Sequence, residues 1–140
     1  MSGKSFLDTN VLIYAFSDDP AKAERAAEVL AAGGSISVQV LNEFVSVCRK
    51  KLKLDWKEIK ERLDVVRALI GEVAPVSIDT HEKAVELARD CGFSFYDALI
   101  VAAAIALNCT DLQTEDMQDG RVLMNLTIRN PFASPAELGR

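Results

Sequence analysis

Short apolar runs alternate along the chain with longer stretches in which apolar residues recur every three or four positions. The short runs, bounded by turn signals, predict strands, and the longer stretches have the period of amphipathic helices. Strands that alternate with helices favour an α/β fold, with a parallel sheet and helices on both faces. We expect strands at residues 5–7, 35–38, 75–78 and 108–114 with one or two more in 121–128, and helices at about 11–16, 21–32, 39–53, 56–70, 80–91 and 95–107.

Several of the expected helices carry signals at their ends. Gly33 follows one helix, where a glycine is a common stop. Asp55 and Glu58 have the spacing of a capping box, in which each side chain bonds the backbone of the other residue. Asp79 and Glu82 have the same spacing and predict a second box.

Asp8 is the most informative single residue, because it closes the first apolar run just before a helix begins. In open α/β sheets, ligands bind beyond the carboxyl ends of the strands. A carboxylate there is costly to desolvate unless a positive charge lies beside it, which suggests a metal ion. The alternative is that Asp8 merely caps the following helix, although Thr9 or Asn10 could serve as that cap.

Three further segments carry acids in positions that a simple surface role does not explain well. Glu43 lies at the border of the apolar face of its helix. Asp97 opens a helix that is apolar all round, and burial on most sides is therefore expected. The loop after the strand at 108–114 holds Glu115, Asp116 and Asp119, of which Asp116 is the best placed. Glu43 could equally be solvated, Asp97 could form a capping box with Ser94, and the loop acids could lie in a solvated turn.

Taken together, these acids predict a divalent metal site. Four carboxylates brought to one place without a counter-ion would repel one another strongly. Mg²⁺ or Mn²⁺ relieves that repulsion, because both prefer oxygen ligands. Such a site lets an activated water attack a phosphodiester, which is the chemistry of a metal-dependent nuclease.

Composition and charge indicate the number of domains, the way in which nucleic acid could be bound and the location of the protein. The 140 residues suit one domain, and the net charge of −5 argues against a broad basic surface for nucleic acid. The clustered basic strip Arg49, Lys50, Lys51 and Lys53 is the candidate RNA contact. Three cysteines without metal-ligand spacing indicate reduced thiols and a cytoplasmic location. No apolar run approaches the length of a membrane span, so we expect no membrane association.

Four ordered motifs resemble those of the PIN-domain ribonucleases, and most closely the VapC-type toxins of toxin–antitoxin pairs. The resemblance covers nearly the whole chain in the family's order. The motifs are Phe6–Leu12, Asn42–Phe44, Phe95–Ala104 and Leu112–Gly120.

The resemblance implies a single PIN-like domain over residues 1–140, an α/β/α sandwich around a short-stranded parallel sheet, with a Mg²⁺ or Mn²⁺ site. It implies an endoribonuclease and toxin that cleaves RNA, forms a homodimer and is inhibited by a cognate antitoxin. By position, the core carboxylates would be Asp8, Glu43 and Asp97, with Asp116 as the fourth and Glu115 or Asp119 as its alternatives. The supporting residues would be Thr9, Asn10, Ser94 and Thr114.

Apolar residues from Trp56 to Ile70 recur at spacings of three and four. They could pack onto the domain's own core. Alternatively, residues 39–70 could form a helical projection that grips an apolar antitoxin helix.

Three rival functions share parts of this pattern. A phosphatase of the haloacid dehalogenase type needs a second Asp two residues after the first, where this chain has Asn10. A phospho-receiver domain needs a late lysine, and this chain has none after Lys83. A PIN-like scaffold that binds a partner without catalysis is the third, and the apparently intact acid set argues against it.

Overall fold

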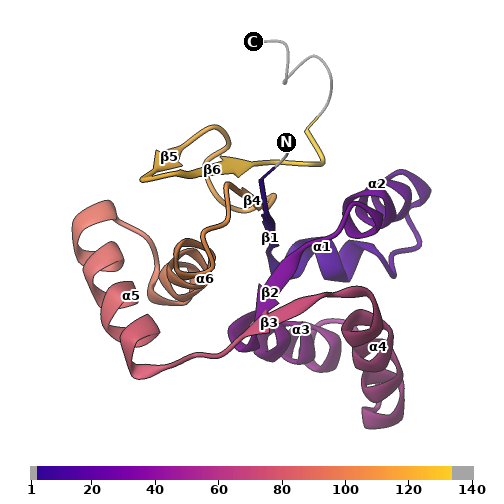
Figure 1. Ribbon diagram of the computed structural model, residues 1–140. Helices are drawn as coiled ribbons and strands as arrows, with labels where there is room; N and C mark the ends of the chain where they lie inside the picture. Colours follow the sequence, from indigo (N-terminus) through magenta and orange to yellow (C-terminus); the bar gives the residue numbers. More distant parts are fainter. Residues whose placement is uncertain (1–2, 134–140) are drawn as a thin grey trace.

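The computed structural model describes residues 3–133 and shows a six-stranded sheet between two layers of helices. Helices α5 and α6 lie on one side of the sheet, and α1 to α4 lie on the other (Figure 1). The elements are β1 (Ser5–Leu7), α1 (Thr9–Tyr14), α2 (Pro20–Ala31), β2 (Ser35–Ser37), α3 (Val38–Lys50), α4 (Trp56–Leu69), β3 (Glu72–Ala74), α5 (Ile78–Cys91), α6 (Phe95–Ala106), β4 (Asp111–Gln113), β5 (Val122–Leu123) and β6 (Leu126–Arg129). The predicted α/β sandwich is confirmed.

The strand order is β3-β2-β1-β4-β6-β5, and every neighbouring pair is parallel except β5 with β6. The chain therefore starts in the middle of the sheet, moves outward through β2 and β3, and returns to the other side of β1 at β4. This reversal makes the carboxyl edge around β1 the topological switch point, where α/β folds bind ligands.

The core is continuous from the sheet into α6. Phe6 of β1 pairs in register with Leu112 of β4, which pairs with Ile128 of β6, and all three side chains are fully buried. Seven consecutive residues of α6, from Ala98 to Ala104, are buried as well. A helix that is apolar on all sides belongs in the interior, as expected from its sequence.

The segment around residue 75 differs from the prediction. The strand is Glu72–Ala74 rather than 75–78, because Pro75 has no amide hydrogen for a strand ladder and Ser77 already caps the next helix. The capping box predicted for Asp79 and Glu82 is also wrong. Ser77 and Thr80 form the box instead, with the Thr80 amide donating to Ser77 Oγ at 3.1 Å.

The other end signals behave as expected. The capping box of Asp55 with Glu58 is present and starts α4, with the Glu58 amide donating to Asp55 Oδ1 at 2.8 Å. Helix α2 ends at Ala31, just before the glycines. None of the helices in the part of the chain that the structure describes is long and apolar enough to cross a membrane.

The corrected cap can be tested through stability. Ser77→Ala removes the hydroxyl that accepts from the Thr80 amide, so we expect it to lower the free energy of unfolding by about 1 kcal/mol. Glu82→Ala, at an exposed position of the same helix, should change it by less than about 0.5 kcal/mol. Urea denaturation measures both changes. A larger loss of unfolding free energy for Glu82→Ala than for Ser77→Ala would support the capping box of Asp79 with Glu82.

Candidate metal centre

Asp8 lies at the carboxyl end of β1 and is only 3% exposed. It is itself the N-cap of α1, as one of the two interpretations of Asp8 predicts, and neither Thr9 nor Asn10 provides this cap. Its Oδ1 accepts from the Thr9 amide at 2.7 Å, and its Oδ2 accepts from the Thr114 hydroxyl at 2.8 Å. Capping therefore uses one carboxylate oxygen and Thr114 orients the other, which leaves lone pairs for a further ligand.

Glu43 reaches the same edge from the second turn of α3. The Thr9 hydroxyl lies 3.5 Å from Glu43 Oε1, and Gln39 Nε2 donates to Oε2 at 3.1 Å. Thr9 thus contacts Asp8 through its backbone and Glu43 through its side chain. Sequence reasoning missed Gln39, although its position four residues before Glu43 on one helix was the signal that could have found it.

Asp97 lies in the first turn of α6. Ser94 is the N-cap and accepts from the Asp97 amide at 3.3 Å. Within residues 3–133 the structure has no return bond from the Ser94 amide to the Asp97 carboxylate, so this carboxylate is not used by the cap. It is half-buried.

The loop after β4 separates its three acids. Asp116 accepts from Asn10 Nδ2 at 3.1 Å and so lies beside the start of α1. Glu115 turns to α1 and α2, where it accepts from Tyr14 and forms an ion pair with Lys22. Asp119 accepts from the Asn130 amide at 2.9 Å. Of the three, Asp116 is the one directed to the side of Asp8.

Asn10 and Thr114 connect this loop to Asp8. Asn10 Nδ2 donates to Thr114 Oγ1 at 3.1 Å, and its Oδ1 accepts from the Glu115 amide at 3.2 Å. The Asp116 amide donates to the same Thr114 oxygen at 3.1 Å, and that hydroxyl donates a hydrogen bond to Asp8. Thr114 is fully buried, so its bond to Asp8 is shielded from water.

The carboxylates at this edge are close enough to perturb one another. Burial raises the pKa of Asp8 from 3.8 to about 6, and the charges of Glu43 and Asp97 add to the rise. Burial also raises the pKa of Glu43, as do the charges of Asp97 and Asp116. Burial and then the charge of Asp116 raise the pKa of Asp97. The four acids from four segments therefore share one electrostatic environment.

Glu115 behaves in the opposite way. Burial would raise the pKa of Glu115, but the bonds from Lys22 and Tyr14 outweigh it and lower that pKa. The bond to Glu115 in turn raises the pKa of Tyr14 to about 12.

The four converging acids are Asp8, Glu43, Asp97 and Asp116. In the part of the chain that the structure describes, none of them forms an ion pair with a Lys, Arg or His side chain. Over the same residues, no three His, Cys, Asp or Glu side chains are gathered tightly enough to hold one ion directly. The donor set still suits Mg²⁺, which usually binds one or two carboxylates and keeps several waters.

The basic strip predicted to contact RNA lies at the far end of α3. Arg49 donates to the Leu54 carbonyl at 3.0 Å, and its guanidinium lies 5.2 Å from the centre of the Trp56 ring. Lys50, Lys51 and Lys53 are exposed. Arg49 is about 9 Å beyond Glu43 along the helix axis, given the rise of an α-helix.

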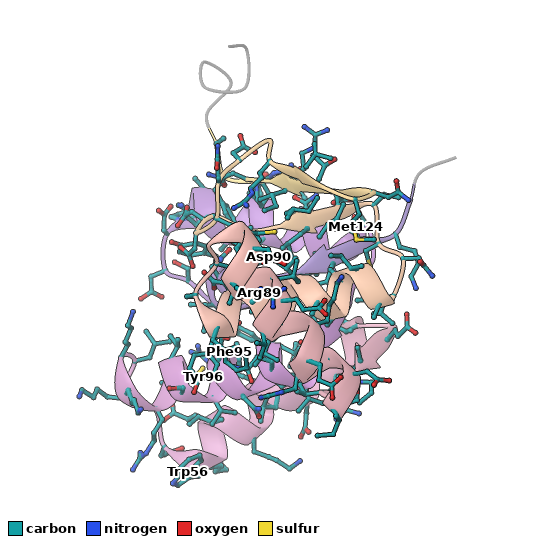
Figure 2. All side chains as sticks on the ribbon, turned by 90° about the vertical axis from the view of Figure 1, so that its left-hand side faces the viewer. Trp56, Arg89, Asp90, Phe95, Tyr96 and Met124 are labelled. Carbon is teal, nitrogen blue, oxygen red and sulfur yellow. The ribbon has the colours of Figure 1, made fainter. Side chains whose placement is uncertain are left out.

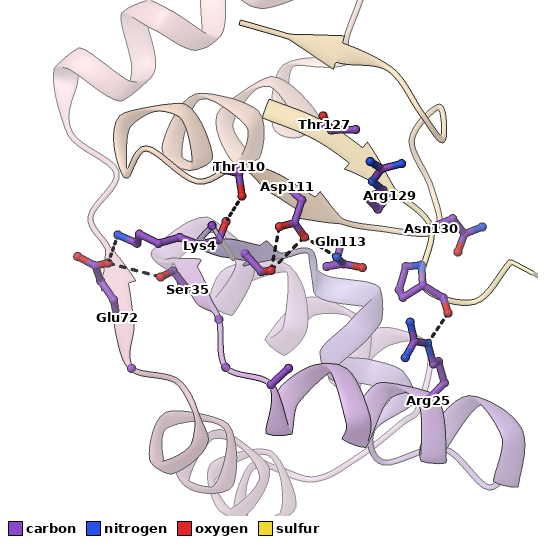
Figure 3. Close-up of a pocket in the computed structure, with 17 residues that line it drawn as sticks. Lys4, Arg25, Ser35, Glu72, Thr110, Asp111, Gln113, Thr127, Arg129 and Asn130 are labelled. Atoms are coloured by element: carbon purple, nitrogen blue, oxygen red, sulfur yellow. Dashed lines mark hydrogen bonds and ion pairs between the residues drawn. The ribbon is translucent and has the colours of Figure 1, made fainter. Parts of the chain in front are cut away.

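A hollow of about 780 Å³ lies elsewhere, lined by residues of β1, β2, β3, β4 and β6 and by Arg25 of α2 (Figure 3). Ser5 donates to the Asp111 carboxylate there at 2.9 and 3.0 Å. None of the four converging acids lines it. The acid cluster is therefore an open edge of the sheet rather than the floor of this hollow.

Comparison with solved structures shows the same fold in toxin–antitoxin proteins. A toxin–antitoxin complex from Klebsiella pneumoniae contains a chain with 24% identity and a TM-score of 0.68, aligned over 91% of this chain and 98% of that one. For VapBC2 from Rickettsia felis, bound to a DNA fragment from its promoter, the identity is 25% and the TM-score 0.66, over 90% and 97% of the two chains.

A third neighbour is VapC20 from Mycobacterium tuberculosis, a sarcin–ricin loop cleaving toxin. Its identity is 20% and its TM-score 0.64, over 78% of this chain and 87% of that one. No curated protein sequence matches the chain significantly.

The PIN domain family model matches residues 5–118, which is most of the chain and includes all four converging acids. This agrees with the sheet order around β1 and with the fold of the toxin–antitoxin neighbours. The chain belongs to the PIN domain family.

Proposed function

We propose that this protein is a Mg²⁺- or Mn²⁺-dependent endoribonuclease and the toxin of a type II toxin–antitoxin pair. The observation that carries the proposal is a buried carboxylate, Asp8, which shares its electrostatic environment with three other acids and has no cationic side chain among residues 3–133 paired with it. The toxin–antitoxin neighbours support the biological role, and the VapC20 neighbour supports a nuclease.

In this proposal Asp8 is the central metal ligand, with Glu43, Asp97 and Asp116 binding directly or through water. A bound divalent ion would supply Lewis-acid activation of water and stabilisation of charge on the phosphate. Thr114 and the Thr9 amide fix the orientation of Asp8, and Gln39 and Thr9 restrain Glu43. In the metal-free site, burial and the charges of Asp97 and Asp116 raise the pKa of Glu43, and a bound divalent ion would offset both effects.

The charge of the protein is consistent with this arrangement. With a net charge of −5, the chain would repel a polyanion, and the acidic edge would repel it most. Neutralisation of the acids by a divalent ion removes that local repulsion. We propose that RNA phosphates further from the acid cluster contact the basic strip at the far end of α3, which consists of Arg49, Lys50, Lys51 and Lys53.

PIN membership favours this function over the phosphatase, since the second Asp required for phosphatase chemistry is replaced by Asn10. Asn10 here holds the Asp116 loop instead. The homodimer and the cytoplasmic location stay predictions. The three cysteines Cys48, Cys91 and Cys109 are free thiols in the structure.

The antitoxin has a candidate docking surface beside α4. Ile59 and Val66 of this helix pack into the core, whereas Trp56, Val65 and Leu69 are exposed. Figure 2 shows Trp56 at the periphery of the molecule. Val65 and Leu69, but not Trp56, line an apolar hollow of about 280 Å³, together with Ala15, Phe16, Ala27, Leu30, Ala31 and Val66. We propose that an apolar antitoxin helix lies in this hollow.

Loss of a converging acid tests the catalytic assignment. Asp97→Asn should lower Mn²⁺-dependent RNA cleavage at least about a hundredfold, the scale for removal of one group that stabilises transition-state charge. Asp119→Asn is the matched control, because Asp119 is an exposed acid that contacts Asn130 instead. Cleavage is measured with purified protein, and circular dichroism verifies folding. Full activity in Asp97→Asn would remove this residue from the mechanism.

The buried charge of Asp8 predicts how the stability of the metal-free protein depends on pH. A pKa raised from 3.8 to about 6 on folding means that burial favours the protonated form. The protonated Asp8 carboxyl contributes its full stabilisation below about pH 4. This stabilisation is lost as the pH rises through 6, and the free energy of unfolding falls by about 3 kcal/mol in total.

The measurement is the difference in unfolding free energy between wild type and Asp8→Asn, in EDTA, from pH 4 to 8. We expect Asp8→Asn to become the more stable protein, relative to wild type, as the pH rises through 6. Addition of Mn²⁺ at pH 7 should stabilise the wild type and not the variant. If the unfolding free energies of the two proteins follow parallel curves against pH, burial does not raise the pKa of Asp8.

Two matched substitutions test the antitoxin surface. Val65 lines the apolar hollow and is 47% exposed, whereas Val122 on β5 is 64% exposed and lies outside it. Val65→Asp should weaken binding of the proposed cognate antitoxin and leave RNA cleavage unchanged, and Val122→Asp should affect neither. Binding is measured by titration calorimetry, and equal affinities for both variants would place the antitoxin elsewhere.

A further inference from the structure

Glu115 lies between Thr114, which bonds Asp8, and Asp116, the fourth converging acid. Its amide donates to Asn10 near the start of α1, and its side chain reaches Tyr14 at the end of the same helix and Lys22 of α2. Nothing in the sequence of the loop distinguishes Glu115 from Asp116, since both are acids in consecutive positions. Their different directions therefore come from the groups that surround them.

The Glu115 side chain is held by Tyr14, Lys22 and Phe132, a group that we call the Glu115 clamp. The Tyr14 hydroxyl donates to Glu115 Oε1 at 2.6 Å, and Lys22 Nζ forms an ion pair with Oε2. Lys22 Nζ also lies 4.5 Å from the centre of the Tyr14 ring and 4.8 Å from that of Phe132. The two rings meet edge to face with centroids 4.8 Å apart.

This clamp differs from the other ion pairs of the protein. Both charged side chains are about 30% exposed or less, and the pair joins residues 93 positions apart in sequence. The pair of Lys57 with Glu61, in contrast, is exposed and lies within one turn of α4. Exposed pairs of that kind contribute little to stability, whereas a partly buried cation between two rings is held more firmly.

The clamp has two consequences for the acid cluster. It engages both oxygens of Glu115, so that this carboxylate is neutralised by Lys22 and does not join the cluster. It also anchors the loop to the end of α1 and to α2, while Asn10 near the start of α1 and Thr114 bond the loop as well, which restricts where Asp116 can lie. Ligands must be held within a fraction of an ångström to bind a metal well, and such restraint matters for the site.

We propose that the Glu115 clamp is a positioning device that selects Asp116 as the fourth acid and holds it toward Asp8. The proposal rests on the proposed function, because it assigns the clamp a role at the metal site. Glu115, Lys22 and Tyr14 do not contact the metal in this account. They act through the backbone of the loop.

The first test is Mn²⁺ affinity by titration calorimetry. Glu115→Ala should weaken Mn²⁺ binding about tenfold, the lower end for groups that orient a metal ligand. Glu61→Ala makes the same change in an exposed ion pair and should leave the affinity unchanged. Tyr14→Phe removes one hydroxyl without any change in charge and should weaken binding in the same direction, but less. Wild-type affinity in Glu115→Ala overturns the proposal.

The second test separates positioning from a general loss of structure. If the clamp acts through Asp116, Glu115→Ala should have no further effect on Mn²⁺ affinity in an Asp116→Asn background. A full additional loss in the double variant would show that Glu115 acts independently, which contradicts the proposal.

A third measurement keeps the proposal distinct from the proposed function. Amide hydrogen exchange at residues 114–116 of the metal-free protein should accelerate in Glu115→Ala and Tyr14→Phe and not in Glu61→Ala. If Asp8→Asn binds Mn²⁺ like the wild type, the proposed function fails, and exchange alone then decides whether the clamp positions the loop. If Asp8→Asn loses Mn²⁺ and the clamp variants match the wild type in affinity and exchange, only the clamp fails.

Discussion

The rest of the site depends on one unfavourable arrangement, the burial of the Asp8 carboxylate at the end of a central strand without a paired cation among the described residues. Burial raises its pKa to about 6, even though the Thr9 amide and the Thr114 hydroxyl both donate to it. An isolated structural cap gains nothing from such burial, since exposed Asp residues cap helices equally well. A divalent ion bound to Asp8 would explain why the carboxylate is buried, because the charge of the ion would offset the free-energy cost of desolvating it.

The fold explains why acids so distant in sequence meet at this point. The sheet order reverses at β1, so the segments after β1 and β4 lie side by side, and α3 begins directly after the neighbouring strand β2. The buried α6 places Asp97 at its first turn, facing the same edge. Asp8 and Asp97 thus lie at the ends of rigid elements and Glu43 in the second turn of α3, whereas Asp116 has the least regular support, because it lies in a loop.

Much of this arrangement could be predicted from the sequence, and the reasons differ from residue to residue. Asp8 and Asp97 follow from local patterns, a buried strand that ends in an acid and an apolar helix that starts with one. The sequence favours Asp116 among the loop acids but leaves Glu115 and Asp119 as alternatives, because the choice depends on Lys22 and Asn130, which reach the loop only in the folded chain. The strand at Glu72–Ala74 was misplaced because Val76 and Ile78 made the next segment look more apolar than the strand itself.

The central claim is that the four acids share one ion, and a crystal structure grown with Mn²⁺ tests it most directly. Anomalous scattering locates manganese without reference to the protein atoms. The account predicts a manganese peak at the carboxyl end of β1, ligated by Asp8 and at least one of Glu43, Asp97 and Asp116. Well-ordered density for all four side chains with manganese bound only elsewhere on the protein would contradict it.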